Sequence, residues 1–156
     1  MRRMHAADRR VTYAEMLEWP DDSRQYELYD GEAIVVPVPF PGHQRVTSNV
    51  ADLLRDYAKT TGGLALFAPL DLVFSEHNVV QPDVVFFSCE RRHLVKDSEV
   101  TRAAPNLAVE VLSESSADDP RPGVHYRPDV CRPTILVVGV NGRVTERCPL
   151  APGAPS

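Results

Sequence analysis

The sequence predicts one domain of the mixed α/β (α+β) class, with a central mixed sheet flanked by helices. Three observations favour this class. One long amphipathic helix pattern is present, several short apolar runs follow it, and turn signals separate those runs. The 156 residues, 43% of them hydrophobic, suit one domain with one core. We place the domain at residues 1–148 and expect the proline-rich segment 149–156, PLAPGAPS, to be a disordered tail.

The first predicted element is a short helix from Thr12 to Trp19. Thr12 is a suitable N-cap, and Glu15 stands three residues later, which is the spacing of a capping box. Pro20 ends the pattern because proline cannot continue a helix without losing a backbone hydrogen bond.

A β-hairpin is predicted next. Residues 26–29 and 32–36 both have the composition of strands, and the pair Asp30-Gly31 separates them. An Asp-Gly pair between two such runs favours a tight two-residue turn, because both positions need positive φ angles.

The clearest helix pattern covers residues 43–60. Its apolar residues recur at spacings of three and four and form one stripe. They are Val46, Val50, Leu53, Leu54 and Tyr57. The pair Gly62-Gly63 is expected to end this helix.

Strands dominate the remainder. Apolar runs predict strands at 64–67, 70–74, 84–88 and 107–112, with one helical turn at 91–94. A second hairpin is predicted from residues 134–140 and 143–147, turned at Asn141-Gly142.

Three carboxylates stand where acidic residues are structurally costly. Glu110 lies inside the apolar run LAVEVL, Asp83 follows Pro82 and opens the run VVFF, and Glu27 lies within YELYDG. A charge in a buried strand costs several kcal/mol unless it is paired or bound to a metal. Structural explanations exist for each: an ion pair or a solvent-facing edge position for Glu110, a turn cap for Asp83, and a cross-strand pair for Glu27.

The functional interpretation of these acids is a metal site. Two carboxylates at the ends of adjacent strands can hold Mg²⁺ or Mn²⁺, which prefer oxygen ligands. The backbone carbonyl of Val111 is a candidate third ligand for the metal held by Asp83 and Glu110. Such a metal lowers the pKa of bound water and stabilises charge on a phosphate, which is the chemistry of a nuclease.

Four stretches of the chain resemble the Uma-type restriction endonuclease family of the PD-(D/E)XK superfamily. They are YELYDGE at 26–32, PFPGHQRV at 39–46, HNVVQPDVVFFS at 77–88 and APNLAVEVLSESS at 104–116. Each stretch alone is a weak signal, and their order and spacing make the combination specific. The resemblance covers roughly residues 10–140.

The resemblance implies a restriction-endonuclease-like fold, a divalent metal and cleavage of DNA. By position, Asp83 matches the acid of the PD motif, and Glu110 matches the acid of the (D/E)XK motif. Glu27 matches an auxiliary acid from the first strand region. His43 matches the histidine that precedes the long helix, without an assigned role, and a surface histidine at the helix start is its simpler interpretation.

The chain departs from the family pattern at its lysine. Leu112 stands where the plain motif has lysine, and no lysine occurs after Lys96. In this family the lysine usually comes from the helix after the strand, but here that segment contains several prolines. Arg121 or His125 could take over the contact with phosphate or water, since arginine clamps phosphate and histidine exchanges protons near neutral pH. The alternative is that neither side chain faces the site.

Two functional hypotheses follow. The first is a metal-dependent endonuclease that hydrolyses DNA phosphodiester bonds, impaired by the loss of the lysine. The second is a catalytically inactive family member that acts as a DNA-binding or assembly module. A net charge of -5 is unlike that of a strong non-specific DNA binder and favours the second. A glycosidase-like carboxylate pair is a weaker third hypothesis, because the chain has a single tryptophan, Trp19, and no evident aromatic cluster.

Location and assembly are expectations only. No apolar run is long enough for a membrane span, and the basic first ten residues lack the apolar stretch of a secretory signal, so we expect a cytoplasmic protein. The three cysteines form no CxxC pair, which argues against a zinc site. A homodimer is expected, because nucleases that cut both strands often pair two sites symmetrically.

Overall fold

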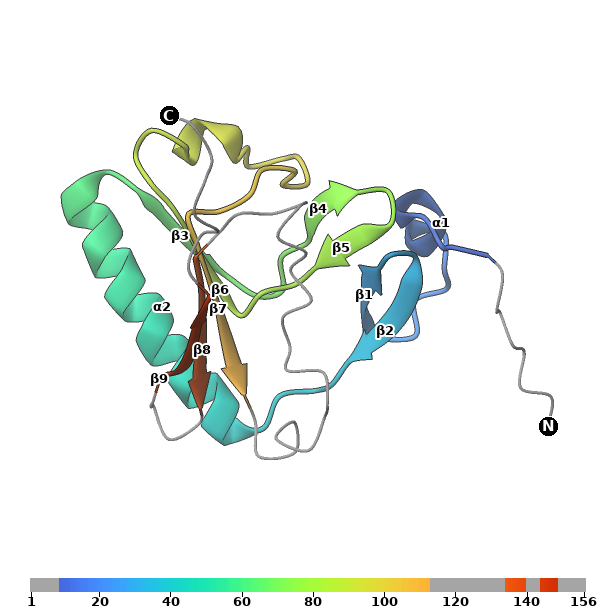
Figure 1. The fold of residues 1–156 in the computed structure, drawn as a ribbon, viewed down its shortest axis with the longest axis horizontal. Coiled ribbons are helices and arrows are strands. Elements are labelled where there is room, and N and C mark those ends of the chain that lie inside the picture. Colours follow the sequence, from blue (N-terminus) through green and yellow to red (C-terminus); the bar gives the residue numbers. More distant parts are fainter. Residues whose placement is uncertain (1–8, 113–133, 140–143, 149–156) are drawn as a thin grey trace.

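The computed structural model describes residues 9–112, 134–139 and 144–148, and its helices and strands confirm the mixed α/β (α+β) class (Figure 1). In chain order the elements are α1 (Tyr13–Leu17), β1 (Gln25–Tyr29), β2 (Glu32–Val36), α2 (Pro41–Thr61), β3 (Leu64–Phe67), β4 (Leu72–Ser75), β5 (Asn78–Val80), β6 (Val84–Phe87), the 3₁₀ turn η1 (Arg92–Leu94), β7 (Leu107–Leu112), β8 (Thr134–Gly139) and β9 (Val144–Cys148).

The strands form two sheets rather than one central sheet. The five-stranded sheet has the order β3-β6-β7-β8-β9 and is mixed, because β7 and β8 run parallel while the other neighbours are antiparallel. The four-stranded sheet has the order β2-β1-β5-β4 and is antiparallel throughout. The first hairpin therefore belongs to a second sheet. Strand β5, which joins it to β4, was not predicted because three residues carry too little pattern.

Helix α2 ends at the predicted signal and begins at Pro41, two residues before the predicted start. Proline stands in its first turn, and Gly62 adopts the left-handed conformation at φ 75°, which satisfies the C-terminal carbonyls without a Cβ clash. Val46 is buried as predicted, but Leu53 is 71% exposed, so its place in the buried stripe was wrong. The C-terminal half of the helix packs on the edge strand β3, and a sheet edge covers only part of the stripe.

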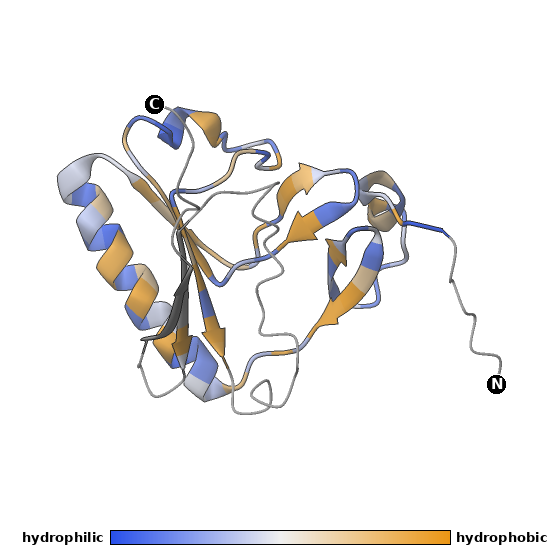
Figure 2. Ribbon diagram, in the orientation of Figure 1, coloured by the Kyte–Doolittle hydropathy of each residue, from blue (hydrophilic) through white to orange (hydrophobic). Residues whose placement is uncertain are grey.

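The hydrophobic core lies on both faces of the five-stranded sheet. All four residues of β6 are buried, as expected for a central strand covered on both sides. Val84 and Val109 pack with the buried face of α2, while Val85 and Phe87 pack on the opposite face with Leu72 of the second sheet. Figure 2 shows hydrophobic residues in the strands that lie between α2 and the four-stranded sheet.

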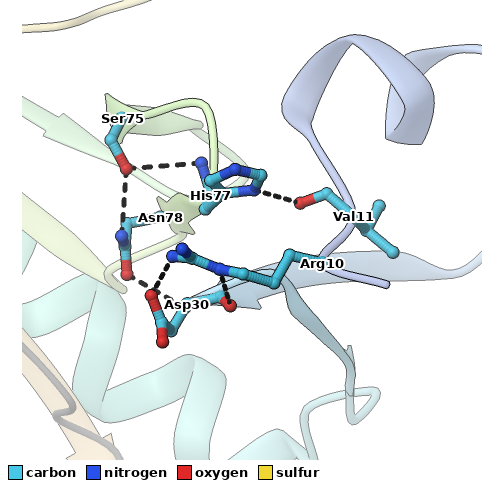
Figure 3. Close-up of polar contacts among 6 residues, drawn as sticks. All are labelled: Arg10, Val11, Asp30, Ser75, His77 and Asn78. Carbon is cyan, nitrogen blue, oxygen red and sulfur yellow. Dashed lines mark hydrogen bonds and ion pairs between the residues drawn. The ribbon is translucent and has the colours of Figure 1, made fainter. Parts of the chain in front are cut away.

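The N-terminal segment is tied to the turns of the four-stranded sheet (Figure 3). The predicted capping box of α1 is present. Asp30 and Gly31 have φ angles of 52° and 85°, which confirms the predicted hairpin turn. The Arg10 side chain forms an ion pair with Asp30 and donates to its carbonyl at 2.9 Å. His77 Nδ1 donates to the Val11 carbonyl at 2.8 Å.

The second predicted hairpin is confirmed in its strands. β8 and β9 are antiparallel, and their register shifts once between Val137 and Val138. The predicted turn at Asn141-Gly142 and the expected tail at 149–156 lie outside the described residues. Among the residues that the structure describes, no helix is long and apolar enough to cross a lipid bilayer.

Candidate carboxylate site

Asp83 stands immediately before β6, at the point where that strand meets β7. Its Oδ2 atom accepts the backbone N–H of Val111 at 2.7 Å and lies 3.2 Å from Nε2 of His43. The side chain is 16% exposed. The ladder between β6 and β7 ends at the pair Val84–Val109. Beyond it, the Asp83 carboxylate accepts the Val111 N–H in place of a backbone carbonyl. The aspartate therefore connects two strands and the first turn of α2.

His43 lies in the first turn of α2 with its ring directed at Asp83. The hydrogen bond to Asp83 raises the pKa of His43, burial opposes this, and the negative charge of Asp83 and a backbone hydrogen bond with Val111 add to the rise. Nδ1 of the ring lies 3.4 Å from Oγ1 of Thr47, one helical turn further on. The simpler sequence interpretation, a surface histidine, does not hold, because the side chain is only 15% exposed.

Glu27 lies in the middle of β1, in the four-stranded sheet. Its Oε1 atom accepts the backbone N–H of Gln81 at 2.6 Å, and its Oε2 atom accepts the Tyr29 hydroxyl at 2.7 Å. Burial raises the pKa of Glu27, and the charges of Asp83 and Asp71 add to this, while the two hydrogen bonds lower it. The structure thus holds this carboxylate in one orientation between the two sheets.

Further hydrogen bonds join Gln81, which binds Glu27, to Asp71 and Tyr13. The Gln81 amide donates to Oδ1 of Asp71 at 2.6 Å, and the Tyr13 hydroxyl donates to Oδ2 of Asp71 at 3.2 Å. Burial, followed by the charge of Asp71 and the hydrogen bond to it, raises the pKa of Tyr13. The amide oxygen of Gln81 is buried and accepts no hydrogen bond from the described residues. This network connects α1 to the segment that carries Asp83.

Glu110 lies in β7, one residue before Val111. Its pKa is raised well above the ordinary value, first by burial and then by the negative charges of Asp83 and Glu27. No cation and no hydrogen-bond donor reaches its carboxylate from the described part of the chain. The ion pair with an arginine that would have explained Glu110 structurally is therefore absent among those residues.

Glu27, Asp83 and Glu110 lie within electrostatic reach of one another. Each of the two glutamates has its pKa raised by the charge of Asp83, and Glu27 also acts on Glu110. Within residues 9–112, 134–139 and 144–148, no three His, Cys, Asp or Glu side chains already converge in a metal-holding arrangement. The donor set nevertheless fits a hard divalent cation, since it is rich in carboxylate oxygen.

Other predicted site residues can be placed only in part. The Val111 N–H binds Asp83, and the use of its carbonyl as a metal ligand stays a prediction. Arg121 and His125 lie outside the described residues. Sequence reasoning did not find Asp71, although the signal was present: like Asp83, it is an acid placed directly before an apolar strand.

A protein family and a solved structure are similar to this chain. The family model described as "Putative restriction endonuclease" (Uma2) matches residues 13–122, more than half of the chain. The chain therefore belongs to the Uma2 family, as the sequence motifs indicated.

A solved structure with the same fold is described as a "putative nuclease belonging to DUF820" from Anabaena variabilis ATCC 29413. Its TM-score is 0.64 at 19% identity, and the match covers 83% of this chain and 74% of that one. The search of curated proteins found no match.

Proposed function

We propose that this chain is a divalent-metal-dependent endonuclease that hydrolyses phosphodiester bonds of DNA. The observation that carries the proposal is that Asp83 and Glu27 are each held by a backbone N–H, and that the charges of both raise the pKa of Glu110. Membership of the family described as "Putative restriction endonuclease" supports this reaction class. Acids whose pKa is raised by burial and by the charge of a neighbouring acid are more frequent at functional sites than elsewhere, because folding alone would favour neutral side chains there.

Asp83 and Glu110 would hold Mg²⁺ or Mn²⁺, with the Val111 carbonyl as a further ligand and Glu27 as the auxiliary acid. When bound, such a metal supplies a nucleophilic water and neutralises charge on the phosphate. The chain's own part is orientation. His43 and the Val111 N–H fix one oxygen of Asp83, which leaves Oδ1 for a ligand, and Gln81 and Tyr29 fix both oxygens of Glu27.

A second candidate function is a DNA-binding or assembly module that has lost catalysis. The observation in its favour is Leu112 in the lysine position, with no lysine after Lys96. Loss of an electrostatic contact of this kind lowers a rate by about 10²–10³. In the catalytic proposal, Arg121 or His125 supplies this contact.

The first experiment is a calorimetric titration of Mn²⁺ into the intact protein and into Glu110→Ala. We expect binding to the intact protein and none to the variant, because the variant lacks a ligand and one of the coupled negative charges. Glu32→Ala is the matched control, since Glu32 is exposed in β2 and belongs to no part of the site. Equal binding by the intact protein and Glu110→Ala would remove Glu110 from the metal site.

Cleavage then separates the two candidate functions. The intact protein with Mg²⁺ or Mn²⁺ is expected to cut plasmid DNA, and Asp83→Ala is expected to lose this activity. Metal binding without cleavage by the intact protein would support the non-catalytic module. Cleavage that is equal in the intact protein and Asp83→Ala would indicate a contaminating nuclease and contradict the proposal.

The proposal also includes a cytoplasmic homodimer, since two symmetric sites can cut both strands of a duplex. Sedimentation equilibrium tests the dimer. A monomer at the concentrations that give cleavage would restrict the proposal to single-strand nicking.

A further inference from the structure

A pocket of about 300 Å³ lies beside the carboxylate site, between α2 and the end of β3. One wall is the polar face of the first half of α2, with Gln44, Thr47 and Ser48. Phe67 and Ala68 line it on the β3 side. The proposed metal chemistry uses none of these five residues. A pocket of this volume is at the lower end of small-ligand sites, which favours one planar group over a larger ligand.

Phe67 gives the pocket an exposed aromatic surface. Its side chain is 54% exposed, and the guanidinium of Arg55 lies 5.5 Å from its ring centroid. Single exposed apolar residues are common, so exposure alone would carry nothing. Here the ring lines a pocket, and the guanidinium over it also pairs with Asp52. A base that stacks on Phe67 and a phosphate that binds Arg55 would replace these two contacts.

The α2 wall supplies hydrogen-bonding groups. Gln44, Thr47 and Ser48 stand at spacings of three and four, so they share one helix face. Gln44 and Ser48 are exposed, and within the described residues their side chains make no hydrogen bond to the protein. They are therefore available to a ligand with donors and acceptors on its edge.

The position of the pocket connects it to the carboxylates. Asp83 and His43 line it together with the residues above. Phe67 pairs with Val84 across the β3–β6 ladder, and the Ala68 N–H donates to the Asp83 carbonyl at 3.0 Å. A group seated on Phe67 thus shares the pocket with Asp83.

We propose that this pocket binds a single nucleobase of a DNA strand, next to the phosphate that faces Asp83. Phe67 stacks on the base, Arg55 contacts the backbone phosphate, and Gln44 and Ser48 bind the base edge. The inference rests on the proposed action on DNA and adds to it the recognition of an unstacked base. An enzyme of this kind prefers single-stranded or locally opened DNA, because a base inside a duplex cannot enter the pocket.

The test compares a labelled DNA oligonucleotide of about ten nucleotides with an abasic oligonucleotide of the same length, in Ca²⁺ and by fluorescence anisotropy. The intact protein is expected to bind the base-bearing strand more tightly. Stacking on an aromatic ring contributes ~1–3 kcal/mol per base, so Phe67→Ala and Phe67→Leu are each expected to lower its affinity about tenfold. Neither variant is expected to change binding of the abasic strand. Phe67→Tyr is expected to restore the preference.

Tyr57→Ala is the matched control, because Tyr57 is 55% exposed on α2 and does not line the pocket. Phe67→Leu keeps apolar bulk and protects against loss of folding, which circular dichroism checks. Equal affinity of the intact protein for both oligonucleotides, or a preference unchanged in Phe67→Leu, would overturn the base pocket and leave the nuclease proposal standing. No binding of either oligonucleotide would overturn both.

Discussion

The half-buried carboxylates of the two sheets differ in their hydrogen-bond partners. Glu27, in the four-stranded sheet, accepts hydrogen bonds from Gln81 and Tyr29, and it is held in place by neutral donors. Glu110, in the five-stranded sheet, receives no donor from the described residues and has the larger rise in pKa. The sheet with the stronger hydrophobic core therefore carries the less satisfied acid.

The two sheets also differ in the burial of their strands. Strand β6 is buried along its whole length, whereas β2 of the four-stranded sheet has three exposed residues among five. A fully buried strand contributes enough packing to offset the cost of an unpaired carboxylate nearby, whereas an exposed edge strand such as β2 does not. A bound cation would therefore stabilise the ionised form of Glu110 more than that of Glu27.

The largest expected change in the free energy of unfolding comes from a substitution in the core of the five-stranded sheet. Phe87 is fully buried, so Phe87→Ala is expected to lower the free energy of unfolding by about 3–5 kcal/mol through lost contacts and a cavity. Val35→Ala in β2 is the control, because Val35 is 43% exposed, and it should cost within about 0.5 kcal/mol. Urea denaturation measures both, and similar losses would contradict the contrast between the sheets.

The next effect concerns the histidine bonded to Asp83. The pKa of His43 is raised in the folded state, so its pair with Asp83 stabilises the protein fully below the unfolded histidine pKa near 6.5. This contribution is lost as pH rises through the folded pKa. His43→Asn is expected to cost about 1.5–3 kcal/mol at pH 6 in the absence of metal and less at higher pH, since the bond is charge-assisted.

His93→Asn is the control for this measurement, because His93 is exposed on η1. Thermal or urea unfolding across the pH range gives the result. A cost of His43→Asn that does not depend on pH would mean that the pair does not carry the charge assigned to it.

A smaller change in stability is expected when each of the two glutamates is replaced by glutamine, and it should differ between them. Burial and like charge raise the folded pKa of Glu110, so in EDTA stability falls as pH rises above the ordinary carboxyl pKa of 4.5. Glu110→Gln is expected to remove this loss and to raise the melting temperature at pH 7, by about 2–4 °C for each kcal/mol gained. Glu27→Gln should gain less, because its carboxylate already accepts two hydrogen bonds.

Differential scanning fluorimetry measures the melting temperatures with EDTA and with Mn²⁺. In Mn²⁺ the intact protein is expected to have the higher melting temperature of the two, since it binds the metal and Glu110→Gln does not. Lower stability of Glu110→Gln than of the intact protein in EDTA would show that the Glu110 charge is compensated.

The smallest effect lies at the outer end of the four-stranded sheet (Figure 3). Arg10 and Asp30 are both more than half exposed, so Arg10→Ala is expected to cost only about 0.2–1 kcal/mol, and less at high salt. A double-mutant cycle with Asp30→Asn isolates the pair, because asparagine tolerates the positive φ of this turn position. A coupling energy as large as that of His43 would contradict the ranking.

Local signals in the chain were enough to define most of the elements. The capping box at Thr12, the Asp30-Gly31 turn and the Gly62 helix end all act between neighbouring residues, and each is present. The strands at 64–67 and 107–112 match their predicted bounds. Glu110 was recognised as unusual because a carboxylate interrupts an apolar run within a single strand.

What the tertiary structure added depends on contacts between distant segments. The partition into two sheets rests on the pairing of Leu28 with Val79, and the Asp83–His43 contact joins residues 40 positions apart. The pocket needs Arg55 and Phe67 from two different elements. No short-range pattern encodes such pairs. They form only when the hydrophobic face of α2 packs on the five-stranded sheet, because this packing brings side chains of the helix next to residues at the ends of β3 and β6.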